Sequence, residues 1–150
     1  MYRGQIAAAR WRCPSVVPNL EHFKAHEERH RAIFWVELQS RGRPRCRSYH
    51  LCAVGGFILG FLTGVCGPAA IGATTVAVER VVLSHLRLQL VELETTDPRA
   101  FAAISTIVRD EQSHHDEGIR IVGASRRWTA LLMPIVEAST SAVIWLGMRR

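Results

Sequence analysis

The chain has 150 residues, enough for one domain with a hydrophobic core, and no internal repeat divides it. Hydrophobic residues make up 48% and charged residues 21%, and the formal net charge is +6 at pH 7, so the chain is more apolar and more basic than a typical soluble enzyme. No CxxC spacing occurs among the four cysteines, which argues against a zinc site or a disulfide framework. The segment 1–11 lacks the apolar centre of a signal peptide, so export is not indicated.

Helices are predicted along almost the whole chain. Apolar residues recur at three- and four-residue spacing, and no segment sustains the alternation typical of a strand, so the fold class is all-α. Asp97 followed by Pro98 marks the start of one helix, and Gly123 marks its end. The predicted helices are 1–11, 17–40, 51–66, 70–94, 97–122 and 128–148, with a connector at 41–47.

Two of these segments are strongly apolar, Leu51 to Cys66 and Leu131 to Leu146. Both are shorter than the roughly 20 residues that a helix needs to cross a bilayer, and the second carries Glu137. Insertion into one leaflet, or burial against a partner, is therefore predicted rather than spanning. Burial as core helices of a small bundle is an alternative of equal weight.

The arginines gather beside apolar segments. This placement favours the head groups of anionic lipids over a nucleic acid, which would require basic residues interleaved with aromatic ones or lined along one helix. A plain solvated basic surface is the alternative. The clusters are Arg41, Arg43, Arg45 and Arg47, then Arg126 and Arg127, then Arg149 and Arg150.

Two ExxH motifs carry the chemistry, Glu27 to His30 and Glu111 to His114. Residues three apart on a helix share a face, so each motif directs a carboxylate and an imidazole the same way. Two such motifs on different helices of a bundle can face each other. Carboxylates with imidazole suit iron or manganese better than zinc, and this is the pattern of di-iron carboxylate bundles.

Glu79 interrupts an otherwise apolar helical stretch that begins at Thr74. A carboxylate on an apolar face is costly unless it is paired or coordinated, so Glu79 is predicted to be a further metal ligand. A surface position beside Arg80 is the alternative. His22 and His26 lie one turn apart, and a metal site formed by these two would be accidental.

Several longer motifs resemble the demethoxyubiquinone hydroxylase family. They occur in the family's order and at nearly its spacing, from residue 2 to the C-terminus. They are Tyr2-x-Gly4-Gln5, the Arg43-Pro44 turn, the glycine-rich segment 55–64, the TVAVE segment 75–79 and the RDE-x-x-HHD run 109–116.

The resemblance implies a ferritin-like four-helix bundle that holds two iron ions, with additional apolar helices associated with a membrane. The implied metal ligands are Glu27, His30, Glu79, Glu111 and His114, of which Glu27 and Glu111 would bridge the irons. The three glutamates are also the candidate catalytic residues.

The implied reaction is hydroxylation of a demethoxyubiquinol ring with dioxygen, in ubiquinone biosynthesis. The implied location is peripheral, on the cytoplasmic face of a bacterial inner membrane or the matrix face of the mitochondrial one. Family members also work with a lipid-binding partner protein.

Two further side chains are candidates for support of the metal ligands. A metal-bound histidine needs a partner for its distal nitrogen, and Asp110, directly before Glu111, is the candidate for that role. An exposed Asp110 is the alternative. His85 matches a histidine found at this place in the family.

The family has a sixth ligand, a glutamate on the first helix, a few residues before the segment that corresponds to Tyr2. Its position falls ahead of Met1, so the first core helix is expected to be truncated here, with a start site set too far downstream. The alternative is a non-catalytic or weakly active membrane-associated bundle that lacks one iron ligand. Iron storage in a soluble cage is contradicted by the two apolar segments.

Overall fold

The computed structural model describes residues 1–148, which are helical over most of their length and contain no strand. The helices are α1 (Tyr2–Arg12), α2 (Val17–Ser40), α3 (Tyr49–Cys66), α4 (Pro68–Thr96), α5 (Pro98–Val122) and α6 (Arg126–Met148). A short 3-10 turn, η1 (Pro14–Val16), joins α1 to α2. The all-α prediction is confirmed. Arg149 and Arg150 of the third arginine cluster lie outside the described residues.

The helix boundaries follow local signals. Asp97 caps α5 by accepting a hydrogen bond from the backbone nitrogen of Ala100 at 3.0 Å. Gly67 and Gly123 end α3 and α5 with φ angles of 97° and 56°, which favour glycine. The predicted helices are therefore confirmed within a few residues at each end, and the main differences are extensions.

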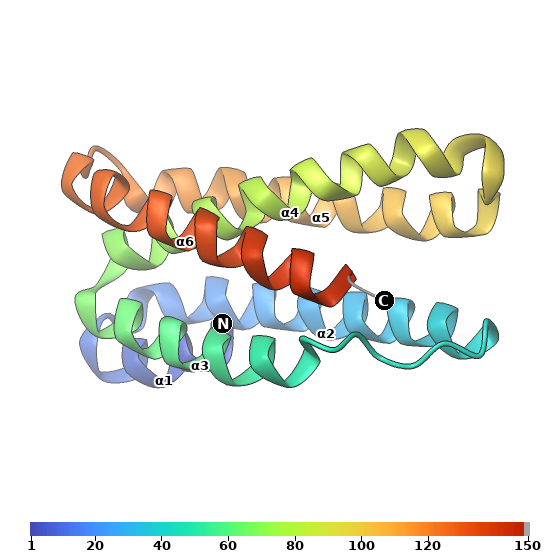
Figure 1. The fold of residues 1–150 in the computed structure, drawn as a ribbon. Helices are drawn as coiled ribbons and strands as arrows, with labels where there is room; N and C mark the ends of the chain where they lie inside the picture. Colours follow the sequence, from blue (N-terminus) through green and yellow to red (C-terminus); the bar gives the residue numbers. More distant parts are fainter. Residues whose placement is uncertain (149–150) are drawn as a thin grey trace.

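The helices form two layers that enclose the core (Figure 1). The antiparallel pair α4 and α5 makes one layer, and α1, α2 and α3 make the other. Helix α6 runs across one side of the bundle and packs on α4. Helix α2 faces both α1 and α5, which places its inner side chains opposite those of the α4 and α5 pair.

Glycines set the spacing between α1 and α3. A Cβ atom on Gly60 would collide with the carbonyl oxygen of Met1, and one on Gly64 would lie 2.7 Å from the Cβ of Ala8. A Cβ on Gly4 would collide with the carbonyl oxygen of Phe57. The glycine-rich segment thus lets two backbones approach closely, which docks α1 against α3.

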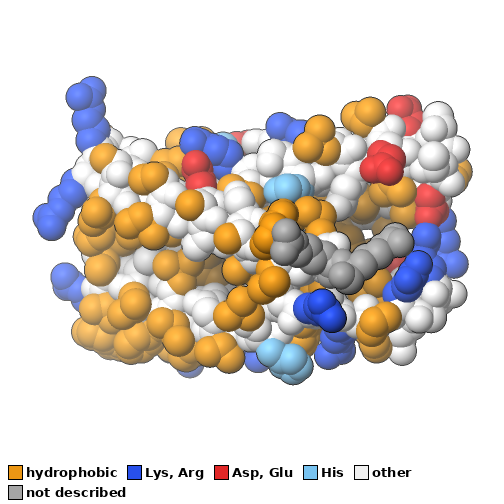
Figure 2. All heavy atoms as spheres, in the orientation of Figure 1, with side chains coloured by type: hydrophobic (Ala, Val, Ile, Leu, Met, Phe, Trp, Pro, Cys, Tyr) orange, Lys and Arg blue, Asp and Glu red, His pale blue; other side chains and the backbone are white. Residues whose placement is uncertain are grey.

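The two apolar helices lie on the surface, so their prediction as possible core helices is wrong. In α3, 17% of the residues in the apolar segment are buried, and in α6 only 6% are. Figure 2 shows hydrophobic side chains gathered over these helices on one face of the molecule. The exposed ones include Leu51, Val54, Phe57, Ile58, Phe61 and Leu62 of α3 and Leu131, Ile135, Trp145, Leu146 and Met148 of α6.

The predicted lengths of the apolar segments are also too short. Within residues 1–148, three helices are long and apolar enough to cross a membrane by length and composition, namely α3, α4 and α6. Helix α6 has 23 residues because it begins at Arg126 and runs past Trp145. Two thirds of the apolar segment of α4 is buried inside the bundle, which makes α4 a core helix here.

Candidate metal centre

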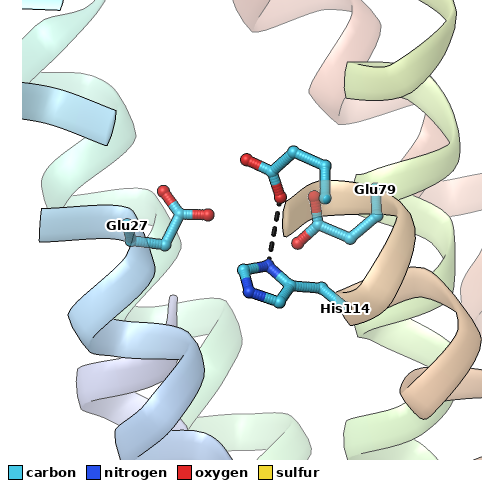
Figure 3. A group of neighbouring side chains, drawn as sticks. Glu27, Glu79 and His114 are labelled. Carbon is cyan, nitrogen blue, oxygen red and sulfur yellow. Dashed lines mark hydrogen bonds and ion pairs between the residues drawn. The ribbon is translucent and has the colours of Figure 1, made fainter. Parts of the chain in front are cut away.

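Three helices bring the predicted ligands together between the two layers. Glu27 comes from α2, Glu79 from α4, and Glu111 and His114 from α5. One ligand atom of each of these four residues lies within 4.8 Å of the others. Figure 3 shows Glu27 reaching from α2 toward Glu79 and His114 on the opposite layer. Glu79, Glu111 and His114 are buried and Glu27 is half-buried.

Glu111 lies at the centre of this group. One of its oxygens is 3.1 Å from Nδ1 of His30, and the other is 3.1 Å from Nδ1 of His114. His30 is outside the group of four but reaches it through this contact with Glu111. The histidines of both ExxH motifs therefore direct the same ring nitrogen, Nδ1, toward one carboxylate.

The glutamates differ in their pKa values. Burial and the negative charge of Glu111 raise the pKa of Glu27, and burial with the charges of Glu111 and Glu27 raises the pKa of Glu79 well above its usual range. Burial alone would raise the pKa of Glu111 too, but its hydrogen bonds with His114 and His30 lower it to about 2. Ionisation of Glu27 and Glu79 beside Glu111 is therefore disfavoured relative to ionisation of a free glutamate.

This donor set fits a metal ion. A cation among Glu27, Glu79 and Glu111 would compensate the charges that burial and mutual repulsion disfavour. Carboxylate oxygens with imidazole nitrogens suit iron or manganese. The carboxylate and histidine cluster is therefore compatible with a metal site.

Asp110 lies behind the ligands. Its Oδ2 is 2.9 Å from Nε2 of His30, the ring nitrogen that points away from Glu111. The side chain of Asp110 also meets Arg29 at 3.3 Å. Asp110 is half-buried. Its carboxylate lies at the position expected of a hydrogen-bond partner for the distal nitrogen of His30.

His85 is not brought into the group. It is half-buried on α4, six residues beyond Glu79, and six residues rotate a helix position by about 240°, so the two side chains do not share a face. Among residues 1–148 no hydrogen bond or ion pair is formed by His85. A supporting role for His85 stays a prediction.

Two residues at the centre were not predicted as site residues. Tyr2 is buried and donates a hydrogen bond of 2.8 Å to Glu79. In the sequence, Tyr2 stood out only as part of the Tyr2-x-Gly4-Gln5 motif. His26 has its Nδ1 3.1 Å from Nε2 of His114. The spacing of His26 and His30, four residues apart on one helix, is the signal that could have directed attention to it.

The family model described as ubiquinone biosynthesis protein COQ7 matches residues 1–147. The chain belongs to this family. This is the family that the sequence motifs predicted. The COQ7 family is ferritin-like and helical, so the predicted fold class is confirmed as well.

Among curated relatives of the COQ7 family, the mouse (Mus musculus) protein named NADPH-dependent 3-demethoxyubiquinone 3-hydroxylase, mitochondrial, is 32% identical over 154 residues. The Rhodospirillum rubrum protein named 3-demethoxyubiquinol 3-hydroxylase is 31% identical over 150 residues. Each alignment covers 99% of this chain and 70% of the relative. The Dictyostelium discoideum protein, named as the mouse one is, is 29% identical over 153 residues, with 99% and 69% covered.

Proposed function

We propose that the chain is a 3-demethoxyubiquinol 3-hydroxylase, an oxidoreductase of ubiquinone biosynthesis that uses dioxygen. The observation that carries the proposal is the arrangement of Glu111 between two histidines, with Glu27 and Glu79 beside it, in a member of the COQ7 family. The three relatives described above are named as demethoxyubiquinone or demethoxyubiquinol 3-hydroxylases and match nearly the whole chain, which supports the same reaction here.

The proposed cofactor is a di-iron centre held by Glu27, His30, Glu79, Glu111 and His114. The pairing of carboxylates with histidines from two ExxH motifs supports this ligand set. When bound, the irons supply the redox chemistry for dioxygen activation. The protein would hold the ligating side chains in place and would shield the buried ones from solvent.

The proposed substrate, a polyprenyl quinol, is apolar, and the proposed location is the membrane surface that contains it. The exposed apolar side chains of α3 and α6 support peripheral membrane association. The cytoplasmic face of a bacterial inner membrane, or the matrix face in mitochondria, is proposed as the side. A lipid-binding partner protein stays a prediction.

Complementation tests the activity. A strain that accumulates the demethoxy intermediate should make ubiquinone again when it expresses this chain, and should fail to do so with Glu79→Ala or Glu111→Ala. Glu92→Ala, which changes an exposed glutamate of the same helix as Glu79, is the matched control and should restore synthesis. If Glu79→Ala and Glu111→Ala restored ubiquinone synthesis as fully as the parent does, the proposed activity would be wrong.

Metal analysis distinguishes the enzyme from the alternative, a non-catalytic or weakly active membrane-associated bundle that lacks one ligand. The purified protein should bind about two iron ions per chain. Under the alternative, iron binding would stay well below this ratio, and the NADPH-dependent hydroxylation of a short-tailed demethoxyquinone would be absent or weak.

A further inference from the structure

His26 occupies a position for which the metal ligands proposed above do not account. It precedes Glu27 on α2, and its side chain turns inward, with 13% of its surface exposed. Its Nδ1 lies 3.1 Å from Nε2 of His114 on α5, a contact between two residues that are 88 positions apart in the chain. The rings of the two histidines have their centroids 5.1 Å apart.

The contact provides a hydrogen-bond partner for Nε2 of His114. The side chain of His114 is fully buried, and its Nδ1 is directed toward Glu111, so its Nε2 must find a partner elsewhere. A buried ring nitrogen without a hydrogen bond is costly. Phe23 packs against the His114 ring with centroids 4.5 Å apart, and it offers no acceptor. His26 is the partner that the structure supplies for this nitrogen.

The two proposed histidine ligands therefore have parallel surroundings. In each, Nδ1 faces Glu111 and Nε2 meets a second side chain, which is Asp110 for His30 and His26 for His114. Asp110 does not engage His26 in the same way, because the closest approach of Oδ1 to Nδ1 of His26 is 3.9 Å. One distal nitrogen is thus held by a carboxylate and the other by an imidazole.

We propose that His26 is a positioning residue of the metal centre: its Nδ1 accepts the Nε2 hydrogen of His114. Imidazole carries its single hydrogen on one nitrogen only, so this bond leaves the Nδ1 lone pair of His114 available to the metal. The hydrogen of the His26 ring is then on its Nε2. This inference rests on the metal site of the proposed function.

Substitutions of His26 can distinguish the effect of its hydrogen-bond acceptor from the effect of its side-chain volume. His26→Leu keeps much of the side-chain volume but offers no acceptor, whereas His26→Asn places an amide oxygen near the position of Nδ1. His22→Ala is the matched control, since the exposed His22 ring lies one turn away and contacts His26 with centroids 4.1 Å apart. Far-UV circular dichroism and thermal unfolding of the metal-free proteins establish that each variant folds.

The first measurement is affinity for Co²⁺, followed by its visible absorption. We expect His26→Leu to weaken binding about 10- to 100-fold, as is typical when the partner of a ligating histidine is removed. His26→Asn and His22→Ala should both bind within about threefold of the parent. Equal losses in His26→Leu and His26→Asn would overturn the inference, because the acceptor would then not be what matters.

The second measurement is proton NMR of the Co²⁺-loaded proteins, in which ring N–H groups of metal-bound histidines give shifted signals that exchange with solvent. His26→Leu should move or broaden one such signal and leave the other, whereas His22→Ala should leave both. If the parent binds Co²⁺, Glu111→Ala does not, and His26→Leu matches the parent, the inference fails and the metal site stands. If the parent itself binds no Co²⁺, the metal site and the inference fail together.

Discussion

At the residue scale, Glu111 organises the centre because both ExxH histidines bond to it. Those bonds stabilise the ionised form of Glu111 and lower its pKa. Burial and the charge of Glu111 raise the pKa values of Glu27 and Glu79. Tyr2 donates to Glu79 and opposes this rise, but burial dominates. In the metal-free centre the protonated forms of Glu27 and Glu79 are therefore more favoured than in free glutamates, and a bound cation would favour their ionised forms instead.

Glu79→Gln should raise the stability of the metal-free protein at neutral pH. The folded pKa of Glu79 lies above its unfolded value of about 4.5, so the stability it contributes is fully present below pH 4.5 and is lost as pH rises toward the folded pKa. Glutamine mimics the protonated form, and the melting temperature with a chelator present should rise by roughly 2–4 °C for each kcal/mol recovered. This gain should vanish as the pH approaches about 4.5. A lower melting temperature than the parent at neutral pH would contradict it.

Cobalt or iron binding should weaken as the pH falls. Because the pKa values of Glu27 and Glu79 are raised, the metal ion must compete with protons for these carboxylates at a higher pH than it would for free glutamates, so the apparent affinity should drop as the groups become protonated. Titrations at several pH values check this, with proton release measured in a weakly buffered solution. An affinity independent of pH would show that the ion does not replace these protons.

Asp110→Ala should lower metal affinity about 10- to 100-fold, because it removes the carboxylate that meets Nε2 of His30. Asp116→Ala is the matched control on the same helix, since its carboxylate meets Gln112 and His115 on the surface. It should bind metal as the parent does. Equal losses in the two variants would indicate a general effect of charge rather than orientation of His30.

At the element scale, the centre depends on how closely the helices approach one another. Glycines let α1 dock on α3, and α1 in turn carries Tyr2 to Glu79. At the far end, ion pairs of Arg41 with Asp97 and of Arg99 with Glu37 tie the end of α2 to the start of α5. These contacts thus link the two helices that carry the ExxH motifs.

Gly60→Ala should destabilise the fold by about 1–3 kcal/mol, since the added Cβ would collide with the carbonyl oxygen of Met1 at the α1 contact. Gly55→Ala on the same helix is the control. Its Cβ would meet nothing within 4 Å, so helix propensity should make it neutral or stabilising by about 0.5–1 kcal/mol. Free energies of unfolding from denaturant titrations check both, and equal values would show that α1 and α3 can move apart without cost.

At the scale of the whole molecule, one face is apolar and the centre lies between the layers behind it. Helices α3 and α6 contribute most of the exposed large hydrophobic side chains of this face (Figure 2). Arg126 and Arg127 lie at the start of α6, where they would meet anionic head groups. The face is therefore suited to a lipid surface.

Replacing Ile58 and Leu62 together by Glu should weaken binding to anionic phospholipid vesicles more than about tenfold, because burying each of these side chains in lipid is worth about 1.5–3 kcal/mol. The matched control replaces Leu88 and Val91, which are exposed on α4, by Glu. Vesicle co-sedimentation measures both. Unchanged binding of the first variant would place the lipid contact elsewhere.

The sequence alone determined the helices, the motifs and the family. Helix periodicity and caps such as Asp97 are local properties, so the predicted helix bounds were nearly correct. The pairing of Glu and His three residues apart is likewise set by the geometry of one helix, and it predicted both ExxH motifs as metal ligands.

Tertiary structure decided what depends on contacts between helices. Periodicity could not tell that α3 and α6 lie on the surface, because an apolar helix looks the same in a core and on an exposed face. Nor could it show that Tyr2 meets Glu79, or that His26 meets His114 across 88 residues, since those contacts exist only once α1, α2, α4 and α5 pack together. The ligand types follow from the sequence, and the partners that orient them follow from the packing.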